Sequence, residues 1–154
     1  DLNTVITKLS VGSPSDRYNN VMQLCQTAHI DVFGAPKTLE YALSLSEANI
    51  PYMISAIIDT YPQVGKALFD QIELLNDINA KAVSVWLFIR ERSQQKAEVA
   101  QALTKRIADR RIIIKKADGS FEDVDTRVDF GVPEYIQNAI ASVTEEIIDD
   151  NIDR

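Results

Sequence analysis

Two side chains near the start of the sequence are of types that could perform catalysis or bind a metal. Cys25 and His29 are four residues apart in a segment with helical periodicity, so their side chains would share one helical face. A thiol beside an imidazole can form a nucleophile and its base, or half of a zinc site. No glycine-rich turn flanks the pair to supply an oxyanion hole, and the chain has only one cysteine and one histidine. The pair is the only catalytic candidate, and we expect an apolar helix face, no enzymatic activity and no cofactor.

Two other groups of residues have the composition of ligand sites without the spacing. The segment 34–38 contains Gly34, Lys37 and Thr38, but it lacks the first glycine of a phosphate loop and has a proline where a backbone donor is needed. Carboxylates gather at 122–125 and 149–153, and the first group lacks the ligand spacing of a calcium loop. We expect solvated acidic surface in both places and no metal site.

Charge is distributed unevenly along the chain. Residues 81–116, the basic band, hold ten basic and three acidic side chains, whereas 117–154 hold eleven acidic and two basic ones. Such asymmetry indicates a partner, which can be another chain or the other half of the same chain. A formal net charge of −7 and an isoelectric point of about 4.7 argue against non-specific nucleic-acid binding by the molecule as a whole.

Apolar periodicity predicts a cluster of short helices over residues 1–79. Five segments repeat apolar side chains at helical spacing, namely 2–9, 15–29, 38–48, 51–61 and 64–78. Thr38 is expected to cap the third of them, and Pro51 to begin the fourth. Isolated helices of this length are marginal in water, so the five must pack together.

The longest helical stretch, 81–109, lies within the basic band. It forms either one long central helix or two helices with a break near Arg92 and Ser93. Residues 82–89 are apolar nearly all round, which predicts burial. The second half is amphipathic, and its basic residues lie mostly away from the apolar face; we expect them on the outer surface. They are Lys96, Lys105, Arg106 and Arg110.

A β-hairpin is predicted over residues 111–130. A β-branched run is followed by a turn containing Gly119 and by a segment, 121–130, in which Val124, Thr126, Val128 and Phe130 alternate with charged residues. A three-residue loop would pair Arg111 with Asp125, whereas a two-residue loop would pair Lys115 with Glu122. Either register sets a basic strand against an acidic one.

The last predicted helix runs from Glu134 to about Asp150. A four–three–four spacing of apolar residues suits a single partner helix. Five acids follow near its C-terminal end, where the helix dipole favours cations, and this sign mismatch indicates either tolerated fraying of the helix end or a basic partner. The apolar residues of this seam are Ile136, Ile140, Val143 and Ile147.

These elements define a mainly α fold: a bundle of short helices, a long central helix, one hairpin and an acidic amphipathic C-terminal helix. We expect a single domain over 1–154, with the short helices in 1–79 and the rest in 80–154. The single cysteine fits a reducing compartment such as the cytoplasm, and a virion would also fit. No apolar run approaches the length of a membrane span, so no membrane partner is expected.

The leading functional hypothesis is a non-enzymatic protein–protein interaction or assembly subunit that self-associates or joins a larger complex, of the kind found in phage particles. The alternative is a winged-helix-like nucleic-acid regulator that uses residues 94–110 as the recognition helix and 111–130 as the wing. Against it, the returning strand carries acids that would repel phosphate. The predicted partner contacts are Lys96, Lys105, Arg106, Arg110, Ile136, Ile140, Val143 and Ile147.

Overall fold

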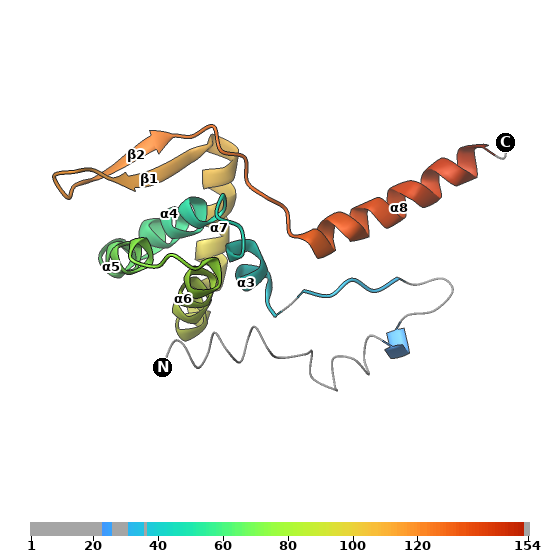
Figure 1. The fold of residues 1–154 in the computed structure, drawn as a ribbon, viewed down its shortest axis with the longest axis horizontal. Helices are drawn as coiled ribbons and strands as arrows, with labels where there is room; N and C mark the ends of the chain where they lie inside the picture. The colour runs from blue at the N-terminus through green and yellow to red at the C-terminus, as the bar shows by residue number, and fades with distance from the viewer. Residues whose placement is uncertain (1–22, 26–30, 36, 153–154) are drawn as a thin grey trace.

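The described part of the chain is mostly helical with a single two-stranded hairpin, as the sequence predicted (Figure 1). The computed structural model describes residues 23–25, 31–35 and 37–152, with the side chains of 145–152 left out. The predicted helices 2–9 and 15–29 therefore lie outside the described residues, except that 23–25 are helical. In the described part, no helix is long and apolar enough to cross a membrane. The elements are α3 (Leu39–Ser44), α4 (Ile50–Thr60), α5 (Pro62–Glu73), α6 (Ile78–Glu91), η1 (Ser93–Gln95), α7 (Lys96–Asp109), β1 (Arg111–Lys115), β2 (Phe121–Asp125) and α8 (Glu134–Ile152).

Helix α4 is the centre of the body. It packs against α5, α6, α7 and β1, and nearly all of its side chains are buried because they face a partner in every direction. Prolines open both α4 and α5 at a position where a missing N–H costs little. The two helices approach closely at Gly65, where an added Cβ would lie 2.9 Å from the Cα of Ile58.

The stretch 81–109 takes the second of its two predicted forms, because it is two helices with a break at Arg92 and Ser93. Helix α6 ends at Glu91, and a short 3-10 turn leads into α7. Arg92 closes the end of α6 by donating from Nη1 to the carbonyl of Phe88 at 3.2 Å. The break lets the two halves bury their apolar faces against different partners, α6 against α3 and α7 against α4.

The hairpin has the register expected for a three-residue loop, with Arg111 opposite Asp125. Lys116 donates its N–H to the carbonyl of Ser120 at 2.8 Å, and Gly119 between them has a φ of 81°. The other edge of β1 is covered by α4, because the N–H of Ile113 donates to the Ser55 hydroxyl at 2.7 Å. This contact explains why a polar residue is buried at the centre of α4.

The second strand is shorter than predicted, ending at Asp125 instead of continuing to Phe130. Residues 126–133 form a connecting segment that turns away from β1 and lies on α4. Tyr52 donates its hydroxyl to the Val128 carbonyl at 2.7 Å and packs edge-on against Phe130. In this segment, contacts with α4 replace the backbone hydrogen bonds to β1. The alternation of side chains in the sequence therefore extends further than the strand itself.

Asn49, which is 1% exposed, anchors the end of the connecting segment. Its side-chain oxygen accepts the N–H of Gly131 at 2.6 Å, and its amide donates to the Gly131 carbonyl at 2.8 Å. The same amide also donates to the carbonyl of Leu43 at 2.8 Å. After this anchor the chain enters α8, which extends away from the body (Figure 1).

Candidate interaction surfaces

Arg106 is not on the outer surface as predicted; it is buried, with 8% of its area exposed. Its guanidinium holds Asp59 of α4 in a two-pronged contact, from Nε at 2.7 Å and Nη2 at 2.6 Å. Nη1 lies 2.8 Å from Asp123 of β2. Arg106 therefore ties α7 to both α4 and the hairpin. Its role is internal because a guanidinium can satisfy two carboxylates at once.

The carboxylates around Arg106 shift the titration of the cluster. Hydrogen bonding to Asp59 raises the pKa of Arg106, although burial acts in the opposite direction. Burial alone would raise the pKa of Asp123, but hydrogen bonds from Arg111 and Arg106 bring it below its ordinary value. Both pKa shifts favour the charged forms of Arg106 and Asp123.

Most of the basic band is neutralised within the chain. Eight of its ten basic residues lie within ion-pair distance of an acid in the described structure. Apart from the pair of the buried Arg106, these surface pairs add little stability one by one, but together the eight cancel much of the positive field that phosphate would need. The pairs are Lys81–Glu47, Arg92–Glu91, Lys96–Glu40, Arg106–Asp59, Arg110–Asp129, Arg111–Asp123, Lys115–Asp70 and Lys116–Glu122.

The exposed face of α7 is close to neutral. Lys105 is exposed as predicted, but Glu98 and Asp109 are exposed on the same helix. Lys96 pairs with Glu40 of α3 at 3.2 Å. A recognition helix for nucleic acid would need an excess of cations here, and α7 does not have one.

Arg110 is exposed at the end of α7 and has a role in the backbone turn. Its φ of 53° places it in the left-handed region, where it caps the helix before β1 begins. Its guanidinium lies 2.7 Å from Asp129 of the connecting segment. The pair is open to solvent, so Arg110 could still exchange this acid for one on a partner.

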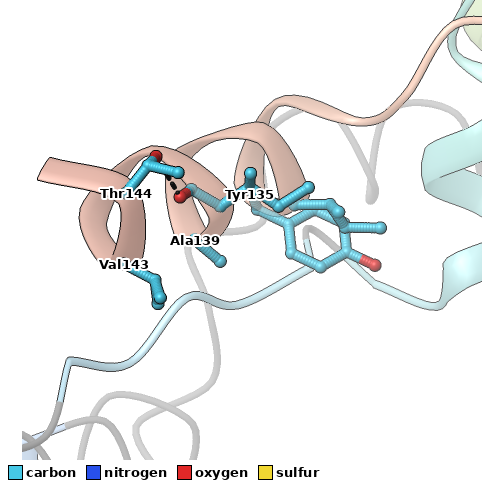
Figure 2. A pocket seen from close by; sticks show the side chains of 6 residues that line it. Tyr135, Ala139, Val143 and Thr144 are labelled. Carbon is cyan, nitrogen blue, oxygen red and sulfur yellow. Dashed lines mark hydrogen bonds between the residues drawn. The ribbon is translucent and has the colours of Figure 1, made fainter. Parts of the chain in front are cut away.

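Helix α8 presents an apolar face to solvent. Ile140 is 59% and Val143 is 58% exposed, although both are large aliphatic side chains. With Ile136 they line an open groove of about 390 Å³ that Figure 2 shows from close by. The described residues of this α8 face are Tyr135, Ile136, Ala139, Ile140, Val143 and Thr144.

No other described helix or strand packs along α8. One described hydrogen bond joins the segment 31–35 to α8, from the hydroxyl of Ser142 to Asp31 at 3.1 Å. This contact leaves the α8 face open at Ile140 and Val143. A helix of this kind normally gains most of its stability from burying its apolar side.

The structure brings together three of the four predicted seam residues. Ile136, Ile140 and Val143 line one groove, whereas the side chain of Ile147 lies outside the described residues. Sequence reasoning missed Tyr135 and Ala139, which border the same groove. Their spacing of four, one position before Ile136 and Ile140, was the signal that could have revealed them.

The catalytic candidate receives no support from geometry. Cys25 is exposed, and His29 lies outside the described residues. Among the residues that the structure describes, no cluster of three or more His, Cys, Asp or Glu could hold a metal ion. Thr38, which belongs to the segment 34–38 compared above with a phosphate loop, accepts the N–H of Tyr41 at 3.3 Å. It is therefore a helix cap, as expected.

No family model, curated protein or solved structure matches this chain.

Proposed function

We propose that the protein is a non-enzymatic subunit that binds another protein through the apolar face of α8. The exposure of Ile140 and Val143 carries this proposal. Fully burying an aliphatic side chain of this size contributes about 1.5–3 kcal/mol of free energy. The exposed side chains of α8 do not contribute this free energy in the isolated chain. A protein partner that covers the face would gain it.

The body supports this role by fixing where α8 begins. The Asn49–Gly131 contacts and the Tyr52–Phe130 pair attach the connecting segment to α4, two to three residues before the helix. Because the segment before α8 is fixed to the body, the helix has fewer orientations to lose when it docks, and the entropic cost of binding is smaller. Assembly subunits use such arms to join a larger complex, and a virion-type complex remains one setting for it.

The nucleic-acid alternative has less support than the sequence suggested. The basic band that motivated it is largely paired with acids of the same chain, and α7 exposes Glu98 and Asp109 beside Lys105. Binding to a random DNA duplex at low salt, lost steeply as salt rises, would restore that alternative.

Site-specific photo-crosslinking in the host that makes the protein tests the proposal. A benzophenone amino acid at position 143 should yield one discrete adduct, whereas the same group at Leu74 should not. Leu74 is a suitable control because it is 83% exposed on the body, more than Val143. Adding Ile140→Asp should abolish the adduct at 143. Equal adducts from both positions, or an adduct insensitive to Ile140→Asp, would refute docking through α8.

A further inference from the structure

The charge of α8 restricts what can cover its apolar face. Its 19 residues include Glu134, two further glutamates and two aspartates, and no lysine or arginine. Four of these five acids fall at positions 145–150, beside the last part of the seam. An occupant of the apolar face must therefore also meet a strongly negative helix end.

A second α8 is a poor occupant. In a parallel pair the two acidic ends would lie together, which like-charge repulsion opposes. In an antiparallel pair each acidic end would face residues 134–144 of its partner, which contain one glutamate and no cation. Neither arrangement provides a basic residue, and the helix end carries the sign that its own dipole disfavours.

The basic band of a second copy is also a poor occupant. Eight of its ten arginines and lysines already pair with acids of their own chain: Arg106 is buried between two carboxylates, and Lys115 pairs with Asp70 of α5. Docking α8 on most of this band would require those internal pairs to break. Pairing of α8 with the basic band of a second copy would therefore have few cations to use.

We infer that the occupant of the α8 face is a different protein, with an apolar groove or helix flanked by lysine and arginine. This inference rests on the proposed function and names the partner's chemistry. Apolar contact with Ile136, Ile140 and Val143 would supply affinity, and the partner's cations beside residues 145–150 would set orientation.

Synthetic helices make the inference testable with the full-length protein. Three peptides of equal length serve as probes: an isoleucine–leucine seam flanked by lysines, the same seam flanked by glutamates, and a scramble of the lysine peptide. The lysine-flanked seam should bind at least about tenfold more tightly than either control, since it alone offers both seam and charge. Raising the salt from about 50 to about 500 mM should weaken it several-fold.

Variants locate the binding on α8. Ile140→Asp and Val143→Asp should each weaken binding of the lysine-flanked seam about tenfold or more. Leu74→Asp should leave it unchanged. All three positions are exposed, so thermal melts should confirm that the fold is kept. Equal binding of the glutamate-flanked seam, or equal binding of the scramble, would overturn the inference.

Self-association separates this inference from the proposed function. Sedimentation of the wild type at neutral pH should show a monomer across the micromolar range. If the wild type forms a dimer and Ile140→Asp abolishes it, the inference of a basic partner is refuted. The proposal that α8 is a docking helix would still stand. If no peptide binds, no dimer forms and crosslinking at 143 matches that at Leu74, then the proposed function fails as well.

Discussion

Replacing Arg106 with methionine should destabilise the protein more than the same replacement of any other basic residue in the basic band. Methionine keeps much of the aliphatic volume of the arginine stem but removes the guanidinium that holds Asp59 and Asp123. Each carboxylate would then lose a charge-assisted contact shorter than 3 Å. The substitution therefore isolates the ion cluster from the packing of α7 against α4.

The magnitude follows from how far the carboxylates are buried. Removing one partner of a fully buried ion pair costs about 3–5 kcal/mol. Here the side chains of Asp59 and Asp123 are 36% and 44% exposed, so water can rehydrate them after the change. We expect a loss of about 2–3 kcal/mol in the free energy of unfolding, and a fall of roughly 5–10 °C in Tm.

Urea denaturation and thermal melts of matched variants provide the assay. Lys105→Met is the control, because Lys105 is the adjacent residue and is exposed; it should change stability by less than about 0.5 kcal/mol. Arg106→Lys should lose about half as much as Arg106→Met, since one ammonium cannot reproduce the two-pronged contact with Asp59.

A double-mutant cycle tests the cause. Asp59→Asn in the Arg106→Met background should cost less than Asp59→Asn in the wild type, giving a coupling energy of about 1–2 kcal/mol. If Arg106→Met and Lys105→Met are equally stable, or if the two substitutions simply add, the cluster does not stabilise the fold and the reasoning is wrong.

Two further predictions concern the anchor and the hairpin. Asn49→Ala should cost about 2–3 kcal/mol, since it leaves both backbone groups of Gly131 without their partner; faster hydrogen exchange at the Gly131 amide would show it, and unchanged exchange would contradict it. The pKa of Asp123 is held below its ordinary value of 3.8, so its stabilising contribution is complete above that pH and declines as the pH falls below it. Asp123→Asn should therefore reduce the loss of Tm between about pH 4 and pH 2, and an unchanged acid profile would count against the ion cluster.

Local signals explain what the sequence could predict. The hairpin followed from the β-branched run and the turn around Gly119, both of which act within a few residues. Cross-strand charge predicted the pairing of a basic with an acidic strand but did not choose between the two registers, of which the structure has Arg111 opposite Asp125. The mainly α content followed from apolar periodicity. The end of the second strand could not be predicted from a local signal, because residues 126–130 keep the alternation of a strand. The chain leaves β1 there to contact Tyr52, which lies more than 70 residues earlier.

Long-range pairing explains what the sequence could not predict. Arg106 lies among other basic residues of an amphipathic helix. Its spacing of three from Leu103 and of seven from Val99 places it beside the apolar face, but its charge predicted exposure. Its acids come from α4 and from β2, at separations of 47 and 17 residues. The sequence left the α6–α7 break undecided for the same reason. Whether the two halves separate depends on the helices against which each half packs, and these are known only from the folded structure.

The charge step along the chain changes meaning once these pairs are counted. A basic band followed by acids looks like a surface for an external partner, yet the fold brings most of the two signs together. The nine described pairs that reach beyond a neighbouring residue link the band to α3, α5, the hairpin and the segments between helices, as well as to α4. None of the described pairs involves α8. Because most of its cations are paired internally, the basic band is a weak candidate for a partner surface. Helix α8 is the stronger candidate, since it is apolar along one face and acidic at its end. No other described helix or strand packs along that face, and no described ion pair involves its acids.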